Sequence, residues 1–221
     1  MSWVWANSSL VAELTWQHLK LAIPPVVLGF LLALPPGVIA WRWRRLRAVL
    51  LTAVGLLYII PSLALFVLIP PILGIPILSD LNVVIALTLY AVALMTRTVS
   101  DGLMAVDPAV RQTAQALGFS AWRRFWTVDL PLAGPVLLAG LRVVAVSTVS
   151  LVTVGVLIGI DSLGNLFTNG LQRNNIAEVT TGIVATVVLA LALDLLLVVA
   201  GRLLLPWART PAAAPESAPS R

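Results

Sequence analysis

Two oppositely charged side chains lie inside long apolar runs of this 221-residue sequence. Arg142 is within the apolar run 133–156, and Asp194 is within the run 179–201. A charge inside a bilayer is costly and usually pairs or serves a function. With a rise of 1.5 Å per residue, both charges would lie roughly 10–12 Å deep, so we expect an intramembrane ion pair. Alternatively, Arg142 reaches the headgroups while Asp194 faces water or another subunit.

No arrangement of residues typical of catalysis can be identified. The chain has one histidine, no cysteine and nine scattered acidic residues, so it offers neither a nucleophile–base pair nor a metal cluster. The phosphate-binding pattern G-x-x-x-x-G-K-[ST] is also missing. We therefore expect neither an enzyme nor a chain that binds ATP or another cofactor itself.

The composition indicates a membrane protein. Hydrophobic residues make up 60% of the chain and charged residues only 10%, whereas soluble proteins carry about 25% charged residues. A spanning helix needs about 20 mostly apolar residues. The sequence therefore predicts an all-α transmembrane fold with five spans, at 21–41, 47–69, 81–99, 133–156 and 179–201.

Prolines occur inside the first two predicted spans, where we expect kinks and not breaks because neighbouring groups can satisfy the freed carbonyls. They are Pro24, Pro25, Pro35, Pro36 and Pro61. The transmembrane domain is predicted over 21–205, after an external N-terminal segment at 1–20. Residues 157–178 are predicted to form a folded external loop, and 206–221 a disordered cytoplasmic tail.

The basic residues predict the orientation of the chain. Of the 14, 11 lie on one side of the predicted spans: Arg42, Arg44, Arg45, Arg47, Arg97, Arg111, Arg123, Arg124, Arg202, Arg209 and Arg221. Only Lys20 and Arg173 lie on the other. Because lysine and arginine gather in cytoplasmic loops, the N-terminus is predicted outside and the C-terminus inside. This distribution explains the net charge of +5 without a nucleic-acid partner.

Two short capped helices are predicted in the loop between the third and fourth spans, about residues 100–131. Asp107 can cap the first helix, and Pro108 suits its first turn. Gly118 can end that helix in a left-handed conformation. Ser120 can cap the second helix, which is expected to stop before Pro131.

The first loop helix has one narrow apolar face, made by Val110, Ala114 and Leu117. Such a helix can dock in the groove of another protein. The alternative is that the loop rests on the bilayer headgroups through its interfacial side chains. These are Trp122, Arg123, Arg124 and Trp126.

The loop resembles the cytoplasmic EAA loop, EAA-x3-G-x9-I-x-LP, of importer permeases of the ATP-binding-cassette (ABC) class. Here Gln112-Thr113-Ala114 is followed after three residues by Gly118, and nine residues later by Val128-Asp129-Leu130-Pro131. The spacing is complete, although Gln112 and Thr113 replace Glu and Ala. In that family this coupling helix docks on the ATPase subunit. The resemblance therefore implies a docking element made of Asp107, Pro108, Val110, Arg111, Gln112, Ala114, Leu117 and Gly118.

The similarity covers roughly residues 14–205 and points to one subgroup. IPSLALF (60–66) and IGIDSLGNLFTNGLQRNN (158–175) resemble permeases for quaternary ammonium osmoprotectants such as glycine betaine, choline, carnitine and proline betaine. The resemblance implies a type I, methionine-permease-like fold in a prokaryotic plasma or inner membrane. It also implies three kinds of protein partner: ABC ATPase subunits that bind ATP, a second permease subunit and an extracytoplasmic binding protein.

Candidate pathway residues come from the spans. Tyr58 and Tyr90 could attract a quaternary ammonium group through their ring faces, or could simply pack. Ser147, Ser150 and Thr153 could line a polar route between two permease subunits, or could allow close helix packing. A permease for another small solute, such as an amino acid, remains an alternative. A channel or secondary transporter is disfavoured because five spans do not divide into equal repeats.

Overall fold

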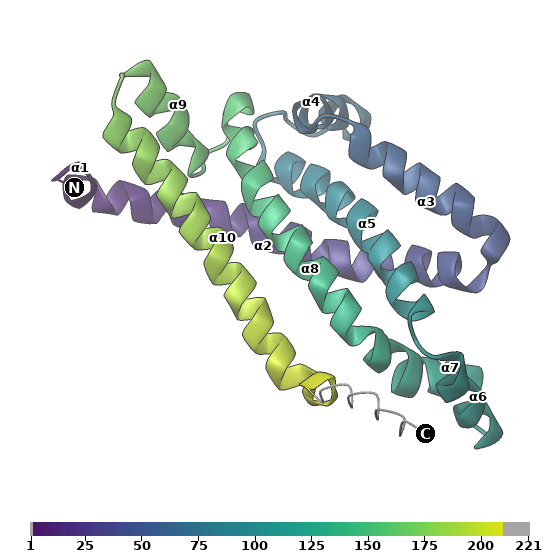
Figure 1. Ribbon diagram of the computed structural model, residues 1–221. Helices are drawn as coiled ribbons and strands as arrows, with labels where there is room; N and C mark the ends of the chain where they lie inside the picture. Colours follow the sequence, from purple (N-terminus) through teal and green to yellow (C-terminus); the bar gives the residue numbers. More distant parts are fainter. Residues whose placement is uncertain (1, 210–221) are drawn as a thin grey trace, which may run out of the picture.

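The structure, a computed structural model, describes residues 2–209, and every regular element in that range is helical. In chain order the elements are α1 (Ser2–Ala6), α2 (Ser8–Arg42), α3 (Arg44–Ile59), α4 (Ser62–Leu73), α5 (Asp80–Met104), α6 (Pro108–Ala116), α7 (Ala121–Arg124), the π-helix η1 (Phe125–Asp129), α8 (Leu130–Val152), the 3-10 helix η2 (Thr153–Ile158), α9 (Gly164–Gln172), α10 (Ile176–Leu204) and the 3-10 turn η3 (Pro206–Arg209). Helix α5 packs against α2 and α8, and α8 packs against α10, with α6 and α7 at one end (Figure 1).

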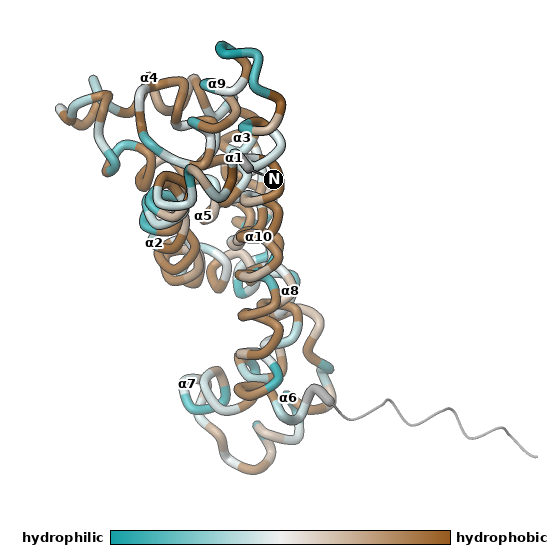
Figure 2. The backbone as a smooth tube through the Cα atoms, turned by 90° about the vertical axis from the view of Figure 1, so that its left-hand side faces the viewer, coloured by the Kyte–Doolittle hydropathy of each residue, from teal (hydrophilic) through white to brown (hydrophobic). Residues whose placement is uncertain are grey.

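Four helical runs in residues 2–209 are long and apolar enough to cross a membrane: Ser8–Arg42, Asp80–Met104, Ala121–Ile158 and Ile176–Leu204. A fifth crossing is counted if α3 and α4 together form one broken span. Apolar residues follow the long helices, and hydrophilic residues gather near α7 and α9 (Figure 2). The predicted all-α membrane architecture is confirmed at this level.

Helix α2 passes through all four of its prolines without a break, as expected. It begins at Ser8, so the segment predicted at 1–20 is largely the first part of this helix. Leu14, His18 and Leu21 lie on one buried face, at positions i, i+4 and i+7. His18 is fully buried, and its Nε2 lies 3.0 Å from the Val149 carbonyl oxygen on α8. This contact ties the start of α2 to the centre of the bundle.

The close packing of α2 on α5 requires a glycine at position 29. A Cβ added at Gly29 would lie 2.2 Å from the Cβ of Ala91, an overlap that rigid helices cannot relieve. We expect Gly29→Ala to reduce the free energy of unfolding by about 1–3 kcal/mol. The melting temperature should then fall by roughly 2–4 °C for each kcal/mol lost. The control is Gly55→Ala, because no atom lies within 4 Å of the added methyl group. Equal melting temperatures in detergent for the two variants would contradict this packing.

The second predicted span, 47–69, is broken and not merely kinked. Helices α3 and α4 meet at an angle of 103°. Pro61 has no N–H to donate, and it disfavours helical geometry at Ile60, which is extended with φ −61° and ψ 126°. The Tyr90 hydroxyl donates a hydrogen bond to the freed Ile60 carbonyl. The break is therefore stabilised by a partner from α5, which no local pattern reveals.

The second loop helix does not stop before Pro131, contrary to the sequence prediction. Helix α7 continues through η1 into α8 as one helical run. The N–H of Leu130 bonds to the Phe125 carbonyl, a π-type spacing that keeps the chain helical up to the proline. Pro131, which has no N–H to donate, lies directly after this π-helix and within the continuous run. The loop helix is thus rigidly continuous with the fourth span.

The segment 157–178 is folded and does not span, as predicted, and helix α9 occupies its centre. Gly164 allows a close turn, because a Cβ there would lie 2.3 Å from the Thr153 carbonyl oxygen. In the predicted disordered tail, residues 206–209 form the turn η3, where Trp207 Nε1 donates to the Pro131 carbonyl at 3.1 Å. The rest of the predicted tail, 210–221, lies outside the described residues.

Candidate functional site: the loop helices and the charged pair

The caps predicted for α6 are present. Asp107 Oδ1 accepts a hydrogen bond from the Ala109 N–H at 2.7 Å, directly before Pro108 at the first helical position. Gly118 has a φ of +81°, and the Phe119 N–H bonds to the Ala114 carbonyl at 3.1 Å. The Ser120 hydroxyl accepts from the Arg123 N–H at 3.3 Å, which caps α7. These contacts fix both ends of a nine-residue helix.

A buried carboxylate that the sequence analysis did not single out holds α6 to the bundle. Asp129 is fully buried and accepts from Arg111 Nε at 2.6 Å and from Arg124 Nε at 3.3 Å. Arg111 also donates to the Leu103 carbonyl, and its guanidinium lies 5.1 Å from the centre of the Trp41 ring. We call Arg111, Arg124 and Asp129 the anchor cluster. Arg111, assigned to the docking element by the resemblance, therefore points back into the protein.

The remaining face of α6 is open. Val110 and Leu117 have 40% and 72% of their surface exposed, whereas Ala114 is buried. A shallow hollow of about 380 Å³ lies along this face, and Phe119 and Val128 also line it. We call it the loop groove. Gln112, which occupies the position of the family's glutamate, is exposed on the same short helix. Within residues 2–209 this end of the chain thus presents an uncovered, partly apolar surface on a rigidly anchored helix.

The predicted ion pair is present. Arg142 on α8 donates two hydrogen bonds to Asp194 on α10, from Nε to Oδ1 and from NH2 to Oδ2, each 2.7 Å long. Two parallel N–H···O bonds fix direction as well as distance. The pair therefore sets the register of α10 against α8.

The candidate pathway residues differ in their surroundings. Tyr90 is buried and its hydroxyl is used at the break before Pro61, so it has a structural role. Tyr58 is 43% exposed and meets the Tyr90 ring edge-on, with centroids 5.6 Å apart. On α8, Ser150 is exposed and Ser147 is half-buried. The hydroxyl of Thr153 donates to the Ser150 carbonyl at 2.6 Å, as expected for a helix back-bond.

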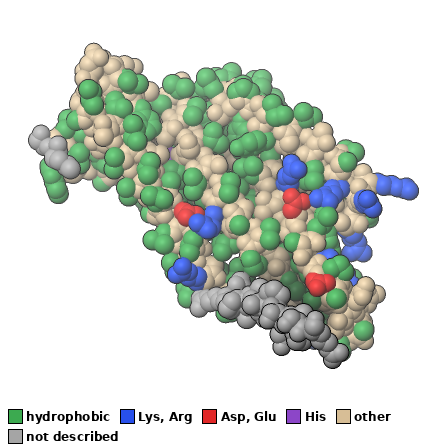
Figure 3. Space-filling model, viewed as in Figure 1, with side chains coloured by type: hydrophobic (Ala, Val, Ile, Leu, Met, Phe, Trp, Pro, Cys, Tyr) green, Lys and Arg blue, Asp and Glu red, His purple; other side chains and the backbone are tan. Residues whose placement is uncertain are grey.

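The arginine-rich segments, which are far apart in the sequence, meet at one end. Arg47, in the first turn of α3, donates to Asp101 near the end of α5 at 2.8 Å. Arg42 and Arg124 line the same cavity. Most of the lysine and arginine side chains visible in Figure 3 lie towards this end. Among residues 2–209 no three histidine, cysteine or acidic side chains are grouped so as to hold a metal ion.

The match to a known family covers most of the chain. Residues 25–210 match the family described as "Binding-protein-dependent transport system inner membrane component". This chain belongs to that family. It is therefore a membrane component of a transport system, and the family is not one of enzymes.

Curated relatives are 29–33% identical to this chain over the aligned residues. The chain is 33% identical, over 86% of its length and 90% of the relative, to the osmoprotectant import permease protein OsmW of Salmonella typhimurium. It is 30% identical, over 81% of each chain, to the carnitine transport permease protein OpuCB of Listeria monocytogenes. It is 29% identical, over 87% of each chain, to the choline transport system permease protein OpuBB of Bacillus subtilis.

A solved structure with the same fold comes from an ABC transporter. A chain of the MetNI methionine ABC transporter, in an inward-facing conformation, has a TM-score of 0.81 to this chain with 21% sequence identity. The similarity covers 90% of this chain and 98% of that one. The methionine-permease-like fold expected from the sequence is therefore present.

Proposed function

We propose that this chain is the transmembrane permease subunit of an ATP-driven ABC importer for quaternary ammonium osmoprotectants. The observation that carries the proposal is the 33% identity to an osmoprotectant import permease over 86% of the chain. Relatives named for carnitine and choline support the same substrate class. These solutes share a permanent ammonium cation. A permease for another small solute, such as an amino acid, is the alternative.

We propose five spans, with the N-terminus outside and the C-terminus inside. The bent pair α3 and α4 counts as one broken span in this topology. Clustering of the arginine-rich segments at one end supports a cytoplasmic assignment for that end, by the positive-inside rule. On the same grounds, α9 faces the extracytoplasmic side, where a binding protein would deliver the solute.

The partners in this proposal are two cytoplasmic ATPase subunits, a second permease subunit and an extracytoplasmic binding protein. ATP is bound and hydrolysed on the ATPase, since this sequence has no phosphate-binding loop. The loop groove receives the ATPase, because it is open, partly apolar and presented by a helix that is capped at both ends. When the ATPase moves, it would displace α6. The anchor cluster would transmit that displacement to α8, which is continuous with α7.

Co-purification of the tagged chain from its native membrane tests this proposal. We expect an ABC ATPase and a binding protein among the bound chains identified by mass spectrometry. In the Leu117→Asp variant, the amount of ATPase that co-purifies is expected to fall at least about tenfold, because a charge replaces an exposed apolar contact in the loop groove. Leu171→Asp is the matched control, since Leu171 is 68% exposed on α9, away from the groove. Recovery of the wild-type chain without any ATPase would refute the importer assignment.

A further inference from the structure

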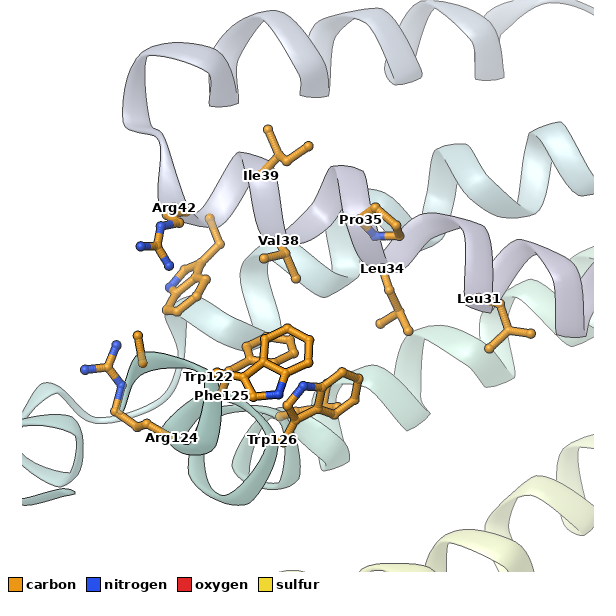
Figure 4. Close-up of a pocket in the computed structure, with 13 residues that line it drawn as sticks. Leu31, Leu34, Pro35, Val38, Ile39, Arg42, Trp122, Arg124, Phe125 and Trp126 are labelled. Atoms are coloured by element: carbon orange, nitrogen blue, oxygen red, sulfur yellow. The ribbon is translucent and has the colours of Figure 1, made fainter. Parts of the chain in front are cut away.

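A larger cavity lies next to the anchor cluster and is not used by the proposed ATPase contact. It has a volume of about 730 Å³ and lies between the last turns of α2 and the run α7–η1. Figure 4 shows Leu31, Leu34 and Val38 along one wall and the rings of Trp122, Phe125 and Trp126 along the other. We call this cavity the interface groove. Its walls are apolar almost throughout.

The three rings form a rigid wall. Trp126 meets Trp122 edge-on, with centroids 5.5 Å apart, and meets Phe125 edge-on at 5.1 Å. Trp122 and Trp126 are nevertheless 73% and 47% exposed, so nothing in residues 2–209 covers them. Tryptophan favours the boundary between headgroups and hydrocarbon, where an apolar ring and a polar N–H are both satisfied. The rings thus present a lipid-compatible wall at a membrane face.

Positive charge is concentrated at one end of the interface groove. Arg42 and Arg124 both line it. Arg124 shares the single carboxylate of Asp129 with Arg111, so the anchor cluster retains a net positive charge. Within residues 2–209 no carboxylate lies in ion-pair distance of Arg42. An anion at this end would therefore meet two guanidinium groups, and that of Arg42 has no carboxylate partner within residues 2–209.

The length of the groove matches half of a bilayer. From Leu31 to Arg42 is eleven residues of α2, or roughly 16 Å along the helix. The hydrocarbon core of a membrane is about 30 Å thick, so one leaflet contributes about half of that. The apolar end therefore reaches the bilayer centre when the arginines lie at the headgroups.

We infer that the interface groove binds an anionic phospholipid. One acyl chain lies between α2 and the aromatic wall, and the phosphate lies against Arg42 and Arg124. The site is separate from the loop groove, so it does not depend on which solute is carried. The occupant is an anionic lipid and not a zwitterionic one, because a zwitterionic headgroup would bring its own positive charge close to the two arginines.

Tryptophan quenching by brominated lipids tests this inference. The full-length chain, assembled with its partner subunits, is reconstituted in vesicles that contain either dibromo-phosphatidylglycerol or dibromo-phosphatidylcholine in an unbrominated phosphatidylcholine background. The groove signal is the tryptophan quenching in the wild type minus the quenching in a Trp122→Phe/Trp126→Phe variant. We expect this signal to be at least about fivefold stronger with dibromo-phosphatidylglycerol than with dibromo-phosphatidylcholine. A preference of that size is what one arginine near an anionic headgroup would produce.

Matched arginine variants locate the site. Arg42→Gln is expected to remove most of the preference, whereas Arg45→Gln, three residues later at the start of α3 and outside the groove, is expected to keep it. Helix content measured by circular dichroism checks that both variants fold. Equal quenching by the two lipids in the wild type would overturn the inference. So would groove tryptophans that neither lipid quenches in the assembled complex, because a protein partner would then cover the groove.

Discussion

Replacing Asp129 by asparagine is expected to reduce solute uptake at least about tenfold, because removing one partner of a buried ion pair costs about 3–5 kcal/mol and 1.4 kcal/mol is a factor of ten. Asparagine has nearly the same shape, so the variant removes charge without opening a cavity. It leaves the side chains of Arg111 and Arg124, which are only 18% and 20% exposed, facing a neutral group. Helix α6 then loses its fixed position against α8.

The control for this variant is Asp101→Asn. Asp101 also accepts from an arginine at this end of the molecule, at 2.8 Å from Arg47, but its side chain is 47% exposed. An exposed pair contributes at most about 1 kcal/mol, so uptake is expected to stay within a few-fold of the wild type. Uptake is measured with labelled glycine betaine in cells that carry the complete importer. If both variants transported equally well, the anchor cluster would have no role in coupling.

Exchanging the intramembrane charges is expected to restore transport that either single change abolishes. Arg142→Asp places two carboxylates together in the bundle, and Asp194→Arg places two guanidinium groups together. Both arrangements are costly inside a membrane, so little protein should reach the folded state. The double variant Arg142→Asp/Asp194→Arg recreates one pair between α8 and α10.

The measurement for the exchange is the amount of folded chain in the membrane, together with uptake per folded molecule. Recovery of both quantities in the double variant is expected if the pair sets the register of α10 on α8. Recovery of folded protein without uptake would mean that the position of each charge serves the pathway. Failure of the double variant on both measures would remove the pair as a structural element.

Local patterns were sufficient to predict α6 and the caps at its two ends. Asp107, Pro108 and Gly118 act within a few residues of their own backbone, so their spacing alone determines the caps. The pair between Arg142 and Asp194 was predictable for a related reason, since two unlike charges at the same depth in apolar helices have few other partners. In each case the sequence contains both interacting groups in recognisable positions.

Contacts between distant segments explain what the sequence analysis missed. At the break before Pro61, the Ile60 carbonyl accepts a hydrogen bond from the Tyr90 hydroxyl, thirty residues away in the sequence. In the sequence Asp129 is only one position of the loop motif. Its role becomes clear in the fold, where Arg111, eighteen residues earlier, donates a hydrogen bond to it. The burial of His18 likewise depends on a contact with α8 that its own segment does not reveal. Periodicity and capping rules carry no information about such partners.

The most direct test of the proposed function is uptake by proteoliposomes that contain this chain with its ATPase and its partner permease subunit. Labelled glycine betaine is supplied on one face together with the binding protein, and ATP on the other. We expect accumulation against a gradient that requires both ATP and the binding protein, and that is lost with Leu117→Asp. Betaine entry that follows its gradient without ATP would contradict the account and would indicate a channel.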